Sequence, residues 1–216
     1  MEQDLSNYRK SYEKRELLEK DVDANNPMTL FQKWFDEADN DASVNEANAM
    51  TLATIGLDGF PKSRVVLLKK IKDGYFIFFT NYGSEKGRAL QETPKACISF
   101  FWESSERQII VKGDISKLSD SENDEYFQSR PRGSRLGAIA SHQSEIIESR
   151  EVLENRLETL DKKYGDKHIP RPNYWGGFKL SPVEYEFWQG RPNRLHDRLR
   201  YRASKSGVWQ LNRLSP

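Results

Sequence analysis

The segment 187–198, Phe-Trp-Gln-Gly-Arg-Pro-Asn-Arg-Leu-His-Asp-Arg, carries the densest set of side chains that could do chemistry. Its arginines present fixed forks of donors, which suit planar, anionic groups. His196 follows Arg194 by two residues and can change its charge near neutral pH. A strand edge does not need this density, because lysine and glutamate also keep an edge soluble. The segment therefore predicts a site for an anionic, aromatic small molecule; the alternative is a solvated edge strand with a basic turn.

A second candidate is the run Arg64-Val-Val-Leu-Leu-Lys69. Side chains alternate across a strand, so Arg64 and Lys69, five positions apart, would point to opposite faces of a regular strand. One strand could then present cations to two different anions. The alternative is a pair of ordinary charges at the ends of a strand.

Two further segments could bind phosphate. Residues 80–88 lead from a strand end into a helix start that contains Ser84 and Lys86, and free N–H groups at a helix N-terminus suit an anion. Residues 126–134, with Tyr126 and Arg130, offer hydroxyl and guanidinium donors. The alternatives are a common serine helix start, and an arginine placed favourably at the C-terminal end of a helix.

Turn signals and periodicity predict the elements that position these residues. We expect helices over 30–38, 85–91, 119–129 and 145–164, the third opening with a capping box of Ser119 and Glu122. We expect strands over 49–56, 62–70, 75–80, 95–102, 107–118, 177–180, 183–189, 198–204 and 208–214, with a turn-rich segment over 130–144. This order predicts one α+β domain, residues 27–216, built on a β-barrel or half-barrel, after a flexible arm of residues 1–26.

Composition excludes several classes of protein. The 34 basic and 33 acidic residues nearly cancel, which argues against a general nucleic-acid binder. The longest apolar run, 75–79, is too short to cross a membrane, and no secretory signal is visible. The single cysteine, Cys97, suggests a core residue in a reducing, cytoplasmic setting. The three histidines are scattered, so no metal site is expected.

Several motifs occur along the chain: Arg64-Val-Val-Leu-Leu-Lys69, Glu106-Arg-Gln108, Tyr126-Phe-Gln-Ser-Arg-Pro-Arg132, Gln143-Ser144, Tyr174-Trp-Gly-Gly-Phe178, Glu186-Phe-Trp-Gln-Gly190 and Arg194-Leu-His-Asp-Arg198. Together they resemble the pyridoxine/pyridoxamine 5'-phosphate oxidase family. They occur in family order and cover nearly the whole chain from Pro27. The resemblance implies a split β-barrel fold, an FMN cofactor, and a homodimer with flavin sites at the subunit interface. It also implies oxidation of pyridoxamine or pyridoxine 5'-phosphate to pyridoxal 5'-phosphate, with O2 reoxidising the flavin to give hydrogen peroxide.

The resemblance also implies roles for individual residues. The FMN site would comprise Arg64, Val65, Val66, Leu67, Leu68, Lys69, Phe79, Thr80, Lys86, Gln108, Gln143, Ser144, Trp188 and Arg198, some of them from the second subunit. The substrate site would comprise Arg9, Tyr12, Lys69, Tyr126, Arg130, Ser134, Arg194, Leu195 and His196. Within these sets, Arg64 and Lys86 would bind the FMN phosphate, and Arg194 and His196 would be the catalytic pair.

One position departs from the family pattern, in which arginine often precedes the FMN-binding lysine. Here the residue is Glu85, whose carboxylate cannot donate to a phosphate, although its backbone N–H can. Other functions remain open: a split-barrel flavoprotein with another substrate, or a protein that binds FMN or pyridoxal phosphate without turnover.

Overall fold

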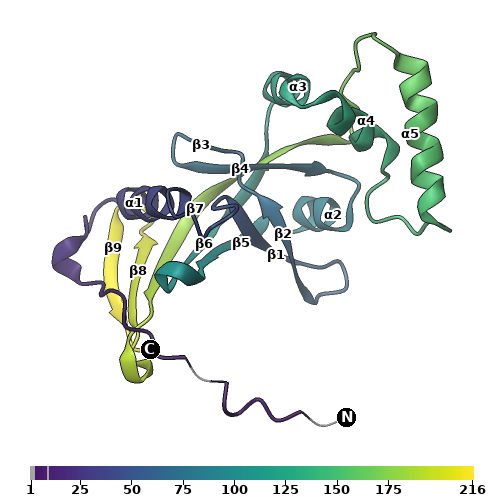
Figure 1. Ribbon diagram of the computed structural model, residues 1–216. Coiled ribbons are helices and arrows are strands. Elements are labelled where there is room, and N and C mark those ends of the chain that lie inside the picture. The colour runs from purple at the N-terminus through teal and green to yellow at the C-terminus, as the bar shows by residue number, and fades with distance from the viewer. Residues whose placement is uncertain (1–2, 9) are drawn as a thin grey trace. The chain divides into compact units, whose positions relative to one another are not determined.

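The computed structural model describes residues 3–8 and 10–216, and its contacts divide the chain into two compact units (Figure 1). Unit 1 consists of Met1–Thr51, Cys97–Lys112 and Pro182–Pro216. Unit 2 consists of Leu52–Ala96 and Gly113–Ser181.

Helices and strands are mixed along the chain, as expected for an α+β protein. The helices are α1 (Pro27–Asp39), α2 (Glu85–Glu92), α3 (Asp120–Ser129), α4 (Arg132–Ala140) and α5 (Arg150–Tyr164), with 3-10 turns η1 (Glu19–Asp21), η2 (Glu103–Ser105) and η3 (Pro192–Arg194). The strands are β1 (Ala49–Ile55), β2 (Pro61–Leu67), β3 (Lys70–Lys72), β4 (Tyr75–Asn81), β5 (Lys95–Trp102), β6 (Arg107–Lys117), β7 (Trp175–Gln189), β8 (Asp197–Ala203) and β9 (Trp209–Leu214).

The described strands form one sheet with the order β2-β1-β5-β6-β7-β4-β3, and β8 and β9 continue from β7. Strand β7 is longer than expected, because the two strands predicted around Pro182 are one. Its first half pairs antiparallel with β4 up to Leu180, and its second half pairs with β8 from Glu184. Pro182 lies between these two registers, where its missing N–H leaves both ladders intact.

Unit 1 is built around aromatic side chains on the inner faces of α1, β5, β7 and β8. Phe31 contacts Phe100 edge to face, and Trp34 meets Phe187 in the same way, with ring centroids 5.4 Å apart in both pairs. Phe187 in turn contacts Tyr201, and all of these rings are buried. Helix α1 forms because Asn26 caps its first turn, Pro27 fits its first position, and its apolar face faces this core.

Unit 2 contains a second apolar cluster of Phe127, Leu136, Ile169 and Trp175, which α3 and α4 cover. Helix α3 opens with the predicted capping box of Ser119 and Glu122, which is confirmed. Helix α4 packs against α5 (Figure 1).

Two predictions of helical structure were wrong in this region. Helix α4 was expected to be a turn, because its glycines, Gly133 and Gly137, lower helix propensity; packing of Leu136 into the cluster overrides that preference. Helix α5 begins at Arg150 rather than at residue 145, and Ile146 before it is fully exposed.

Candidate active site

A cavity of about 860 Å³ lies in unit 2, within the size range of small-molecule sites. Most of the predicted site residues of this unit line it: Arg64, Val65, Val66, Leu67, Lys69, Phe79, Thr80, Lys86, Tyr126, Arg130, Ser134 and Gln143. Leu68 is buried and does not line the cavity, and Ser144 instead accepts a hydrogen bond from the Glu85 N–H. The fold therefore brings together segments that are far apart in sequence.

Arg64 and Lys86 form one cationic end of the cavity. Arg64 Nη1 donates to Thr54 Oγ1 at 2.7 Å, which holds the guanidinium against β1. Lys86 Nζ donates to Gln143 Oε1 at 3.1 Å. Burial lowers the pKa of both cations. The charge of Arg64 lowers the pKa of Lys86 further, and the charge of Glu85 partly opposes the shift at both. Neither is ion-paired within the part of the chain that the structure describes, so an anion placed here would be favoured.

Lys86 reaches the cavity because α2 begins directly after β4. Ser84 caps the helix by accepting the Gly87 N–H at 3.2 Å. Gly87 lies so close to the backbone carbonyls of Asn81 and Tyr82 that any Cβ would collide with them. The absence of a side chain there lets the first turn of α2 seat against the end of the strand.

Arg130 defines a second cationic group beside an aromatic wall. Phe79 and Tyr126 stack with centroids 3.7 Å apart, and Trp175 lies parallel to Phe79 at 5.5 Å. The Arg130 guanidinium carbon lies 4.5 Å from the Trp175 centroid. Burial lowers the pKa of Arg130, and its Nη1 is buried without a hydrogen-bond partner. An orphaned guanidinium nitrogen at a cavity wall is suited to receive an anionic oxygen.

Lys69 lines the same cavity as Arg64, and the regular strand on which their opposite orientation depended is not formed. The expected strand 62–70 is interrupted after Leu67: Leu68 turns into the core, and the Lys69 N–H donates to Ile77 O at 2.9 Å. Side chains alternate between the two faces only along an unbroken strand, so the break after Leu67 removes the alternation between Arg64 and Lys69.

The cavity also contains residues that the sequence reasoning missed. They are Asn81, Pro131, Gly137, Ala138, Ser141 and Trp175. Most lie on or beside α4, which was not predicted. Trp175 belonged to a recognised motif, but its role as the base of the aromatic wall had no signal in the sequence.

Three of the predicted residues of unit 1 lie together beside the turn before β8. Tyr12, Trp188 and His196 form an aromatic cluster, with Trp188 and His196 centroids 4.7 Å apart and Tyr12 edge-on to both. Arg198 donates to Glu186 Oε1 at 2.9 Å and to the carbonyl of Ser215.

The remaining predicted residues of unit 1 have fewer contacts. Gln108 is half-buried on β6, and Arg194 and Leu195 are exposed in the turn before β8. Arg9 lies outside the described residues.

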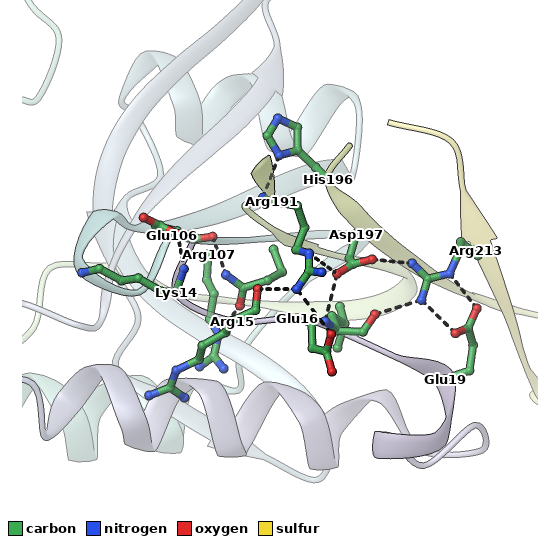
Figure 2. A network of polar contacts seen from close by, with 12 residues as sticks. Lys14, Arg15, Glu16, Glu19, Glu106, Arg107, Arg191, His196, Asp197 and Arg213 are labelled. Carbon is green, nitrogen blue, oxygen red and sulfur yellow. Dashed lines mark hydrogen bonds and ion pairs between the residues drawn. The ribbon is translucent and has the colours of Figure 1, made fainter. Parts of the chain in front are cut away.

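His196 is held by its neighbour in the turn. The backbone N–H of Arg191 donates to His196 Nδ1 at 3.1 Å, so Nδ1 is an acceptor and the neutral ring carries its proton on Nε2 (Figure 2). Partial burial lowers the pKa of His196, and the nearby Arg194 cation lowers it further, while the Asp197 carboxylate acts in the opposite direction. The net effect favours the neutral ring. The backbone of Arg191 thus orients this histidine.

Comparison with known proteins identifies the class. The structure resembles that of PhzG from Burkholderia lata in complex with tetrahydrophenazine-1-carboxylic acid, with a TM-score of 0.86 and 35% identity over 95% of this chain and 100% of that one. An FMN-binding, pyridoxamine 5'-phosphate oxidase-related protein from Nostoc punctiforme has the same fold, with a TM-score of 0.70 and 17% identity over 88% of this chain and 98% of the other. The chain thus has the split β-barrel fold of these proteins.

Sequence comparison gives the family. A model described as pyridoxamine 5'-phosphate oxidase matches residues 37–164, and one described as the pyridoxine 5'-phosphate oxidase C-terminal dimerisation region matches residues 175–216. Pyridoxine/pyridoxamine 5'-phosphate oxidases from Flavobacterium johnsoniae and Christiangramia forsetii are 57% and 56% identical, covering 98% and 100% of this chain and 99% and 100% of theirs. The chain belongs to the pyridoxine/pyridoxamine 5'-phosphate oxidase family.

Among the described residues, no helix is long and apolar enough to cross a membrane, and no cluster of His, Cys, Asp and Glu could hold a metal ion.

Proposed function

We propose that this protein oxidises pyridoxamine 5'-phosphate or pyridoxine 5'-phosphate to pyridoxal 5'-phosphate, with FMN as the hydride acceptor and O2 as the final oxidant. One observation carries the proposal: a single cavity has unpaired cations beside an aromatic wall, with Arg64 and Lys86 in one group and Lys69 and Arg130 lining the same space. Cofactor and substrate each carry a phosphate, so two anions need cations in one site. The family membership supports the same assignment.

The donor set of the cavity fits FMN. Two cations that form no ion pair among the described residues suit its phosphate, and residues 64–67 of β2 supply backbone and apolar side chains beside them. When bound, FMN supplies the two-electron chemistry that the protein's side chains cannot perform. Arg64 and Lys86 would hold the cofactor phosphate, with Gln143, Ser144, Gln108, Trp188 and Arg198 as further contacts.

Lys69, Arg130 and Ser134 would hold the substrate phosphate, with Tyr126 beside it. Binding of the phosphate would also fix the position of C4', where the substrate is oxidised. The bound substrate would then be held in a reactive orientation and would not depend on random collisions. The stacked rings of Phe79 and Tyr126 exclude water from one wall. Arg194 would orient the pyridine ring, and the neutral His196 offers an Nε2 proton as a donor.

We further propose a homodimer, because the match to the dimerisation region covers 175–216, which contains Trp188, Arg194, His196 and Arg198. A second copy could then complete each site. A cytoplasmic location remains an expectation from the single cysteine.

The test is the visible spectrum of purified protein, recorded before and after anaerobic addition of pyridoxamine 5'-phosphate. We expect a flavin band that bleaches on addition and returns with air, with one pyridoxal 5'-phosphate formed per flavin. Pyridoxamine without its phosphate is the matched control and should bleach far more slowly. A colourless protein that takes up no FMN would refute the proposal, and a flavin band that no B6 phosphate bleaches would favour binding without turnover.

A further inference from the structure

Asp197, the first residue of β8, collects donors from three separate parts of unit 1 (Figure 2). Its Oδ2 accepts the Leu17 N–H at 3.0 Å, and its Oδ1 accepts Arg213 Nη1 at 2.7 Å. Arg191 Nε lies 3.6 Å from Oδ2. The side chain is only 14% exposed, so these contacts are shielded from water more than a surface ion pair is.

Through these contacts, the backbone of Leu17 in the N-terminal arm is held on both sides. Arg213, which shares Asp197, also donates through Nη2 to the carbonyl of Leu17 at 2.9 Å. The same guanidinium makes a two-pronged contact with Glu19 at 2.7 and 2.8 Å. The Leu17 side chain is buried at 4% exposure. Residue 17 is therefore fixed by its N–H, its carbonyl and its side chain together.

The other end of the network is the turn that carries Arg194 and His196. Arg191 donates from its backbone to His196 and from its side chain to the carbonyl of Arg15 at 3.2 Å. Asn193 and Arg194 both have a positive φ, 56° and 61°. Two consecutive left-handed residues other than glycine are unfavourable and persist only where surrounding contacts hold them.

Tyr12 lies on this turn as well. It contacts His196 and Trp188 edge to face, and Gly190 packs so closely against it that a Cβ at 190 would lie 2.8 Å from the Tyr12 ring carbon. Arm residues 12–19 and turn residues 191–196 thus pack against each other, and the Asp197 carboxylate contacts both segments.

We propose that Asp197 is a positioning residue, whose carboxylate couples the order of arm residues 12–19 to the orientation of Arg194 and His196. It would touch neither substrate nor cofactor. The inference rests on the proposed function for its effect on turnover, but the coupling itself is a property of the unliganded protein. A purely structural ion-pair network would stabilise the fold without changing the arm and His196 together.

The experiment compares Asp197→Asn with the wild-type holoenzyme. The asparagine keeps size and one acceptor but loses the charge that strengthens the contacts with Arg213 and Arg191. We expect KM for pyridoxamine 5'-phosphate to rise about tenfold, kcat and FMN content to stay within about twofold, and trypsin to cleave faster after Lys14 and Arg15. The NMR signals of the His196 ring should shift in Asp197→Asn and also in Arg213→Gln, which leaves the Asp197 charge that acts directly on the ring in place.

The matched control is Asp114→Asn, which removes a carboxylate from an exposed ion pair with Lys95 and should change none of these readouts. Arg213→Gln provides a second variant if Asp197→Asn folds poorly, because it removes the contacts of Arg213 with Leu17, Glu19 and Asp197 and leaves the Asp197 carboxylate in place. Faster cleavage of the arm with unchanged KM and an unchanged His196 signal would overturn the proposal. Failure of the wild-type enzyme to oxidise B6 phosphates would refute the proposed function. The trypsin cleavage rates and the His196 NMR signals would still test whether Asp197 couples the arm to the turn.

Discussion

The backbone N–H of Arg191 donates to Nδ1 of His196, and this one contact fixes which ring nitrogen of the histidine can donate. The donor is a main-chain group, so it cannot change its own protonation, and it competes directly with a proton on Nδ1. Burial and the Arg194 cation lower the pKa of the ring against the opposing charge of Asp197, and so they also favour the neutral imidazole.

The first prediction concerns the pKa of His196. Removing the cation in Arg194→Ala should raise that pKa toward its ordinary value of 6.5, while partial burial keeps it from rising further. Because the pKa of His196 is lowered in the folded protein, protonation of the ring opposes its contact with the Arg191 N–H. The contribution of the neutral ring to the free energy of unfolding is therefore present above pH 6.5. It is lost as the pH falls through the folded pKa. An NMR titration of the ring measures it, and an unchanged pKa in the variant would contradict the Arg194 effect.

The second prediction concerns Arg130. Arg130→Ala should raise KM for the phosphorylated substrate by about tenfold to a hundredfold, because a charge-assisted contact with phosphate is lost. Arg130→Lys should rescue only partly, since lysine lacks the planar group that stacks over Trp175. Steady-state kinetics measure both.

The control for Arg130 is Arg132→Ala, two residues away, whose guanidinium pairs with Asp161 on the surface. That variant should keep the wild-type KM. Equal effects at 130 and 132 would mean that general loss of charge, not a specific contact, is responsible.

The third prediction concerns Glu85, where the family often has arginine. Its carboxylate pairs with Lys62 at 2.6 Å, which lowers the pKa of Glu85, and its charge also acts on Arg64 and Lys86. Glu85→Gln should therefore tighten FMN binding by severalfold, and the effect should shrink at high salt. FMN fluorescence quenching gives the dissociation constant.

Lys62→Met is the partner variant for Glu85. It should weaken FMN binding when Glu85 is present, because the carboxylate then loses its counter-charge. In the Glu85→Gln background the same change should have little effect, since Lys62 has no carboxylate left to neutralise. A similar loss in both backgrounds would instead indicate that Lys62 acts on the cofactor directly.

The fourth prediction uses two glycines of unit 2. Gly113→Ala should destabilise the protein by about 1–3 kcal/mol, because the new Cβ would collide with the carbonyl of Ser181 and the side chain of Leu180. Gly133→Ala should stabilise it by about 0.5–1 kcal/mol, since Gly133 lies within α4 with open space around it. Denaturant unfolding measures both, and destabilisation by Gly133→Ala would be inconsistent with the open space at that position.

Local chemistry explains which elements could be predicted. The capping box of Ser119 and Glu122, the proline at the start of α1 and the strand Lys95–Trp102 all depend on neighbours along the chain, so their patterns are visible in the sequence. Helix α4 was not predictable in this way, because packing of Leu136 rather than propensity stabilises it.

The sequence by itself indicated the family and most of the side chains that line the cavity, because the motifs that carry them are short and local. Only the tertiary structure decided how these side chains are arranged. The break after Leu67 brings Lys69 into the cavity with Arg64, and burial leaves Nη1 of Arg130 without a hydrogen-bond partner. The contacts of Asp197 with Leu17 and Arg213 join residues from opposite ends of the chain, and no pattern of neighbouring residues encodes such a contact.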